Sequence, residues 1–288
     1  MQVWGVLKQD SILAENIFSL VIKGKKTYYY LRKNMVKKYA KYLKPGVKVV
    51  FEALEEQETH KDLAVYPIDT FYSITRRVKY RTIVYYDQFL IQKGIAKIVN
   101  RKKPVLFIDF EMNMQDYFPI EGFVQEIIEA GYLVCDYYGP VREVRHLYIK
   151  PTKFKKITKR TYNFLPFTKD TFENAVTFKD FYNDFLDLVK KYDPTIFVWG
   201  KSDITQFKKC MEINKIEDYD FNFVDLLQLH VNYFNYKEAP GLFNMWNKYH
   251  GVELEDQSHD ALEDAEVTKD VFFEFKKLIN NGEQHAKK

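Results

Sequence analysis

The chain has little of several residue types, and each scarcity narrows the class of protein. Its 288 residues include only two cysteines, Cys135 and Cys210, too few and too far apart for a disulfide framework or a zinc motif. No apolar run of about 18 residues is present, so we expect no transmembrane span. The N-terminal stretch lacks the basic and apolar regions of a secretion signal. We therefore expect a globular cytoplasmic protein with two buried free thiols and no membrane partner.

Charge is distributed unevenly along the chain. Residues 1–100 contain 18 Lys+Arg and 9 Asp+Glu, a balance of +9, whereas the remaining residues contain 26 basic and 31 acidic side chains, a balance of −5. This asymmetry predicts a basic domain over residues 1–98 and a second domain over residues 99–280. The polar composition of the last residues predicts a flexible tail over residues 281–288. A basic domain is a candidate for binding an anionic partner such as nucleic acid.

The first domain is predicted to be mainly β. Three strand-like stretches, a helix near residues 34–43 and two further strands follow the order of a five-stranded oligonucleotide-binding (OB) barrel. Asn34 is the expected N-cap of this helix. The following stretch, residues 84–99, is predicted to be helical. Residues 23–33 combine cations and aromatic residues, which is typical of proteins that bind single strands. The candidate contacts are Lys25, Tyr28, Tyr30 and Arg32. Since Tyr29 points to the opposite face, some of these tyrosines must belong to the core, and which ones bind bases stays open.

Strands and helices alternate in the second half, which predicts a mixed α/β sheet flanked by helices. Apolar strands are expected at residues 105–111, 126–136, 143–151 and 194–200. Helices are expected at residues 178–192 and 203–214, and a final helix from Ala261 to about Ile279.

The first of these strands, "VLFIDFE", ends in two acids. Asp109 and Glu111 are two residues apart and therefore share a face. They lie at the carboxyl end of the strand, where open α/β sheets bind ligands. Two close like charges repel unless a cation or proton lies between them. Taken alone, the pair is also explained by two acids that simply face water.

Three further polar residues follow strands or precede helices. Asp203 stands at the start of a helix, where capping alone would also explain it, and Ile204, Phe207 and Met211 would anchor that helix to the core. Asp260 and Glu263 have the spacing of a capping box, which starts the final helix there and puts His259 just before it. Asp264 lies on the margin of the buried stripe of this helix. Clustered carboxylates suit hard divalent cations, and a histidine titrates near neutrality. No Gly-rich phosphate loop or serine nucleophile elbow competes with a metal-dependent reaction.

These motifs resemble those of a known family. "FIDFE", "WGKSDITQF" and "HDALEDA", the last with the H-x4-D spacing of a histidine branch, occur in order over residues 104–279. This part of the chain resembles the DEDDh 3′–5′ exonucleases of the RNase T and DNA polymerase III epsilon-like superfamily, which have an RNase H-like fold. "DFE", "QEIIEAG" and the tryptophan of the second motif make it most similar to the KapD-like and Eri-like group.

The resemblance implies a site and a reaction. Asp109, Glu111, Asp203 and Asp264 would bind two divalent cations, Mg²⁺ or Mn²⁺, and His259 would be the general base. The substrate would be single-stranded RNA or DNA with a free 3′ end, RNA being favoured, and the products nucleoside 5′-monophosphates. Met112 would pack against the terminal sugar or base, or else in the core. A DNA proofreading or repair exonuclease and a non-catalytic nucleic-acid-binding scaffold are the alternatives, and a homodimer stays open.

Overall fold

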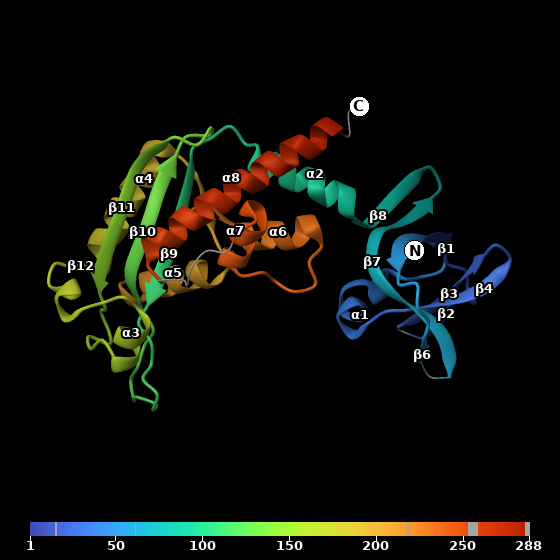
Figure 1. Ribbon diagram of the computed structural model, residues 1–288, viewed down its shortest axis with the longest axis horizontal. Helices are drawn as coiled ribbons and strands as arrows, with labels where there is room; N and C mark the ends of the chain where they lie inside the picture. Colours follow the sequence, from blue (N-terminus) through green and yellow to red (C-terminus); the bar gives the residue numbers. More distant parts are fainter. Residues whose placement is uncertain (15, 61, 218, 253–258, 286–288) are drawn as a thin grey trace. The chain divides into compact units, whose positions relative to one another are not determined.

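The computed structural model describes residues 1–14, 16–60, 62–217, 219–252 and 259–285 (Figure 1). It divides into two compact units, Met1–Ile95 and Ala96–Lys288. The functional boundary expected at residues 98 and 99 remains a prediction, because compactness does not show which part folds or acts alone. Among the described helices, none is both long and apolar enough to cross a membrane.

Unit 1 is mainly β, as predicted. Its elements are β1 (Gln2–Val6), β2 (Ile12–Ala14), β3 (Ile17–Ile22), β4 (Lys25–Tyr30), α1 (Lys33–Tyr39), η1 (Ala40–Tyr42), β5 (Val47–Ala53), β6 (Glu58–His60), β7 (Leu63–Val78) and β8 (Arg81–Asp87), followed by α2 (Gln88–Val99), which extends into unit 2. The main strands pair in the order β1-β5-β7-β4-β3-β2. β1 and β2 are consecutive in the chain yet lie at the two ends of this order, where they pair with β5 and β3 respectively. An OB-like barrel has this arrangement, because its first strand pairs with neighbours on both sides.

Two local expectations in unit 1 were wrong. Residues 84–87, the first quarter of the stretch 84–99, are strand. The β-branched and aromatic residues of β8 pair antiparallel with β7, Thr75 opposite Val84 and Ile74 opposite Tyr86. The first helix begins at Lys33 with Arg32 at its N-cap position. The side chain of Asn34 instead accepts a bond from the backbone of Met35.

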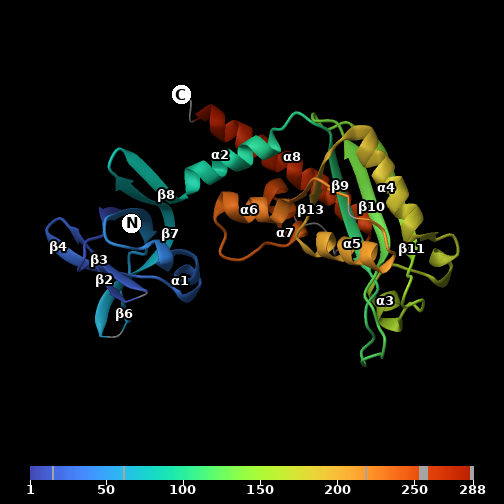
Figure 2. The same ribbon diagram turned by 180° about the vertical axis from the view of Figure 1, so that it is seen from behind.

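Unit 2 is a mixed sheet covered by helices (Figure 2). Its elements are β9 (Val105–Met112), β10 (Ile127–Cys135), β11 (Val141–Lys150), α3 (Lys159–Phe164), η2 (Lys169–Phe172), β12 (Val176–Thr177), α4 (Phe178–Tyr192), β13 (Thr195–Val198), α5 (Ser202–Ile213), β14 (Phe223–Asp225), α6 (Leu226–Phe234), α7 (Leu242–His250) and α8 (Ala261–His285). The strand order is β12-β11-β10-β9-β13-β14, with β10 antiparallel and β13 parallel to β9. The predicted strands and helices are therefore present.

Opposite faces of β9 pack against different helices. Leu106, Ile108 and Phe110 belong to a core with α4 and α5, and Phe110 stacks on Phe207 of α5 at 5.7 Å between ring centroids. Phe107 points the other way and contacts Phe272 of α8 at 5.3 Å. Since side chains alternate along a strand, Asp109 and Glu111 share the face that α8 covers.

Helix α8 begins at Ala261, as predicted, and its expected inner stripe is buried. The stripe consists of Ala261, Ala265, Thr268, Phe272, Phe275 and Ile279. The helix continues past Ile279 to His285, and the flexibility expected for residues 281–288 remains a prediction. Both cysteines are buried free thiols, and burial raises the pKa of each to about 11.

Candidate active site

The carboxyl end of β9 meets the first turn of α8 at a glycine. Gly131 of β10 pairs with Asp109 across the sheet. A Cβ added to Gly131 would lie 2.1 Å from the backbone nitrogen of Leu262 and 2.3 Å from the carbonyl carbon of Ala261. Only a residue without a side chain allows the helix backbone to approach the strand so closely. This contact fixes the start of α8 beside Asp109 and places Asp264, which is 4 % exposed, over the same face.

A second helix, α5, contributes Asp203. The residue lies in the first turn of α5 and is 5 % exposed. Phe207 and Met211, farther along the same helix, are buried in the core and anchor it there, as the sequence predicted. Strand β13, which precedes α5, runs parallel to β9, so the N-terminus of α5 and the end of β9 fall at the same edge of the sheet.

Electrostatics show that these four carboxyl groups influence one another strongly. Burial raises the pKa of Asp109 well above its ordinary value, and the charges of Asp203, Asp264 and Glu111 raise it further. Burial, followed by the charge of Asp264, raises the pKa of Glu111 to about 8. The same two causes raise the pKa of Asp203 to about 7. Burial and the charges of neighbouring acids together raise the pKa of Asp109, Glu111 and Asp203, and a divalent cation would stabilise the ionised form of such carboxylates.

His259 lies at the exposed side of this cluster. Its Nδ1 is 3.9 Å from Oε1 of Glu111, and candidate ligand atoms of Glu111, His259 and Asp264 all fall within 4.8 Å of one another. Its ring lies against Phe164 of α3, with the centroids 4.3 Å apart. Partial burial lowers the pKa of the imidazole. The backbone of His259 has a φ of +54°, a left-handed conformation that is uncommon for a residue with a side chain.

A second polar cluster, which the sequence analysis missed, supports the His259 turn. His146 Nε2 is 2.5 Å from Oε1 of the buried Glu129 and 3.8 Å from Oδ2 of Asp260. Asp260 also accepts bonds from the backbone of Leu262 and Glu263, each at 3.0 Å, and so caps α8 as predicted. The one available signal was Glu129 itself, an acid inside the apolar run "IIEAGYLVC", directly opposite Glu111 in the sheet.

The other sequence-predicted contacts lie elsewhere. Met112 is half-buried against the core next to the site. Lys25, Tyr28, Tyr30 and Arg32 all belong to unit 1, on or directly after β4, and the buried neighbour Tyr29 is a core residue. Tyr30 lies against His60 at 4.2 Å between centroids, and Arg32 is 3.7 Å from Glu58.

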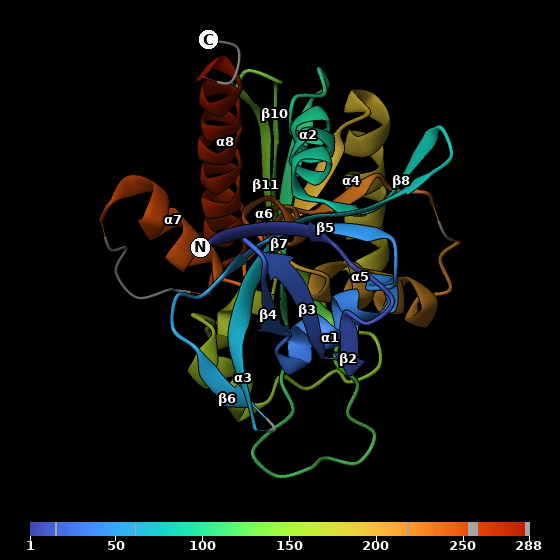
Figure 3. The same cartoon turned by 90° about the vertical axis from the view of Figure 1, so that its right-hand side faces the viewer.

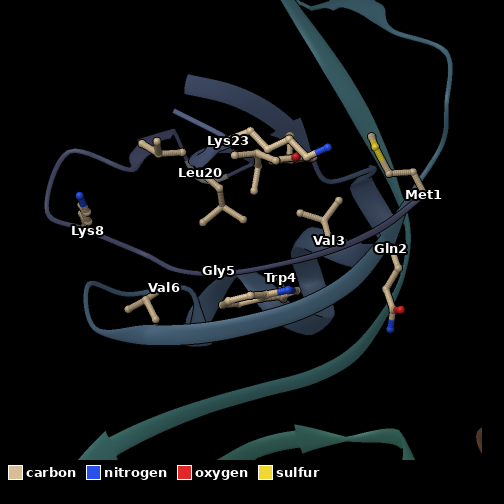
Figure 4. A pocket seen from close by; sticks show the side chains of 12 residues that line it. Met1, Gln2, Val3, Trp4, Gly5, Val6, Lys8, Leu20 and Lys23 are labelled. Carbon is tan, nitrogen blue, oxygen red and sulfur yellow. The ribbon is translucent and has the colours of Figure 1, made fainter. Parts of the chain in front are cut away.

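Unit 1 also contains a hollow that the sequence did not predict. It measures about 880 Å³ and is lined by residues of β1 and β3, including Trp4, Leu20 and Val21 (Figure 4). Trp4 is 67 % exposed, and the ammonium of Lys48 lies 5.6 Å from its ring centroid. Gly5 allows this arrangement, because a Cβ there would lie 2.8 Å from the side chain of Leu20.

The fold and the acid-lined sheet edge of unit 2 define a nuclease of the RNase H-like class, and comparison with known proteins agrees. Residues 106–272 match the profile of the RNase T exonuclease family. The "Probable 3'-5' exonuclease KapD" of Bacillus subtilis (strain 168) is 32% identical over 187 residues, which are 64% of this chain and 88% of that protein.

Two solved structures share the fold of this part. The nuclease domain of 3'hExo, described as a DEDDh family member bound to rAMP, superposes with a TM-score of 0.54 at 19% identity, over 63% of this chain and 94% of that one. Cell-death related nuclease 4 (CRN-4) gives a TM-score of 0.51 at 19% identity, over 62% and 64% of the two chains. The chain belongs to the RNase T exonuclease family and is a 3′–5′ exonuclease of the DEDDh class.

Proposed function

We propose that this exonuclease degrades single-stranded nucleic acid, RNA in preference to DNA, and releases nucleoside 5′-monophosphates. The observation that carries the proposal is the gathering of four mutually repelling carboxyl groups at one sheet edge, with His259 3.9 Å from Glu111. The preference for RNA is supported by two solved structures that share the fold, one of a nuclease domain bound to rAMP and one of a 3'-exonuclease recognising a histone mRNA stem-loop.

Asp109, Glu111, Asp203 and Asp264 would hold two divalent cations, Mg²⁺ or Mn²⁺. Carboxylate oxygens are the donors these hard ions prefer. The raised pKa values of Asp109, Glu111 and Asp203 support this role, since repulsion among unneutralised carboxylates is what a cation relieves. When bound, the cations would stabilise negative charge on the attacking and leaving oxygens of the phosphodiester.

His259 would accept the proton of the attacking water. Its lowered pKa keeps the imidazole neutral at physiological pH, which a general base requires. The contact with Phe164 restricts the ring, and the capped start of α8 fixes the backbone that follows it. Met112, beside Glu111 on β9, would contact the terminal nucleotide.

Unit 1 would bind the same strand through Lys25, Tyr28, Tyr30 and Arg32. The exposed cations and half-exposed rings on β4 support this role, and OB barrels bind single strands through such a combination. The hollow beside Trp4 offers a further stacking ring. The buried thiols suit a reducing compartment, so we propose a cytoplasmic location.

The test is degradation of 5′-labelled single-stranded RNA and DNA of equal sequence with Mg²⁺ or Mn²⁺. We expect a ladder that shortens from the 3′ end, faster for RNA, which a chelator abolishes. Asp109→Asn should abolish the ladder, and His259→Asn should lower the rate by about 10²-fold to 10⁴-fold. Full activity of Asp109→Asn would show that the site has been misplaced, and equal rates on both substrates would remove the RNA preference.

A further inference from the structure

A strongly basic segment lies next to the active site, outside all residues assigned above. Residues 150–160, "KPTKFKKITKR", contain six basic residues and no acid, and we call them the basic segment. All six charged side chains are exposed. Within the described part of the chain, none of them takes part in an ion pair. Their charge is therefore available to an anionic ligand.

The backbone of this segment is bound by a buried carboxylate. Glu126, 2 % exposed, accepts the backbone N–H groups of Thr152 at 2.8 Å, Lys153 at 2.9 Å and Phe154 at 3.0 Å. Bonds from N–H groups to a carboxylate are about twice as strong as neutral ones. The buried acid thus orders the segment while its lysines face solvent, which reduces the entropy lost when a ligand binds.

The C-terminal end of the basic segment is connected to the active site. Thr158 donates its hydroxyl to the carbonyl of Met114 at 2.7 Å, and the N–H of Met114 donates to Thr161 at 2.9 Å, just beyond the end of β9. Helix α3 continues from the segment to Phe164, which contacts His259. Figures 1, 2 and 3 all place α3 and the loop after β9 at the same end of the unit 2 sheet.

Exposed aromatic rings stand beside these cations. Tyr117 and Phe118, in the loop after β9, are 68 % and 82 % exposed. The guanidinium of Arg160 lies 5.7 Å from the centroid of Tyr117 and donates to the carbonyl of Gln115 at 3.4 Å. Exposed rings next to cations are the chemistry that binds single-stranded nucleic acid, because bases stack on the rings while phosphates meet the cations.

We propose that the basic segment, with Tyr117 and Phe118, binds the substrate strand upstream of its 3′ end. The proposal rests on the proposed function, since a strand that enters a cluster of carboxylates needs cations outside it to offset repulsion of its phosphates. The continuity with the active site favours a nucleic acid over an acidic protein. Such a surface would contribute to the binding of strands of several nucleotides. It would not affect the binding of a dinucleotide, which is too short to reach it.

The test uses full-length Lys155→Gln/Lys156→Gln/Lys159→Gln and a control of equal charge change, Lys179→Gln/Lys190→Gln/Lys209→Gln, exposed lysines on α4 and α5. We expect KM for a single-stranded 12-mer to rise about tenfold in the first variant with kcat unchanged, and cleavage of a dinucleotide to stay the same. The slope of log affinity against log salt should fall by about 2, at about 0.7 for each of three phosphates. An unchanged KM for the 12-mer, an equal rise for the dinucleotide, or the same rise in the control would overturn the proposal.

Binding measured without turnover separates this inference from the proposed function. In an Asp109→Asn background, fluorescence anisotropy should show weaker binding of the 12-mer by the triple variant even if no substrate were ever cleaved. Phe118→Ser should weaken binding several-fold without changing the salt slope, because stacking is not ionic. If the segment bound an acidic poly-glutamate peptide but not the 12-mer, the partner would be a protein and the proposal would be wrong.

Discussion

Replacing Gly131 by alanine should displace the start of α8 from the active site. The new Cβ would lie 2.1 Å from the nitrogen of Leu262, whereas ordinary contact begins near 3.4 Å. The nitrogen of Leu262 and the carbonyl carbon of Ala261, 2.3 Å away, are backbone atoms, so no side-chain rotation can relieve the clash. The helix and strand must separate by roughly 1.3 Å at the point where α8 carries Asp264 towards Asp109.

The consequence should be larger for catalysis than for stability. A misplacement of about 1 Å can lower a rate by about 10²-fold, whereas overpacking of this kind costs about 1–3 kcal/mol. We therefore expect Gly131→Ala to remain folded, with a midpoint of thermal unfolding lower by several degrees, and to lose at least 99% of its exonuclease rate by this ~10²-fold estimate. The assay is single-turnover cleavage of 5′-labelled RNA at saturating enzyme, beside a thermal melt.

Gly94→Ala in α2 is the matched control, because a Cβ there would meet no atom within 4 Å. It should leave the rate unchanged and raise stability by about 0.5–1 kcal/mol, since alanine favours helix. If Gly131→Ala cleaved RNA at the rate of the unaltered enzyme, the close approach of α8 to β10 would not be what positions the acids.

Further predictions concern the charges of the site and its support. Without divalent ions, the free energy of unfolding should fall as pH rises from about 4 to about 8. The unfolded chain releases its protons first, because folding raises the pKa of Asp203 to about 7 and that of Glu111 to about 8. Thermal melts in chelator at a series of pH values check this, and a free energy of unfolding that rises over this range would refute it. Asp203→Asn should weaken the dependence of the melting temperature on pH and raise the melting temperature at pH 8 in chelator. It should also lower the cleavage rate at least 10²-fold, because the site keeps a destabilising acid that activity requires. Glu126→Ala should cost about 3 kcal/mol in urea unfolding, because three backbone N–H groups lose a charged acceptor. A cost below about 0.5 kcal/mol would mean that water replaces the carboxylate.

Periodic features of the fold were predictable from the sequence. The apolar run before Asp109, the inner stripe of α8 and the anchoring residues of α5 follow alternation or helical spacing, and burial in the structure agrees with each. Residues 84–87 were mispredicted as helix because their aromatic residues occur in both helices and strands. Only the pairing with β7 selects the strand.

Contacts between distant segments could not be predicted in the same way. Phe164 meets His259, and His146 meets both Glu129 and Asp260, through folding of loops and strands that carry no periodic signal. Nothing in the sequence around Gly131 indicates that a helix backbone approaches it, and its role becomes visible only when the position of α8 is known. The basic segment was visible as composition, but its position next to the active site depends on the hydrogen bonds of Met114, which accepts from Thr158 and donates to Thr161.

The central claim is that four carboxylates form one site for two divalent cations. Counting bound Mn²⁺ by electron paramagnetic resonance, with adenosine 5′-monophosphate present, tests it most directly. We expect two Mn²⁺ ions per chain, and fewer in Asp109→Asn at the same free metal concentration. Two ions retained in Asp109→Asn, or none bound by the unaltered chain, would contradict it.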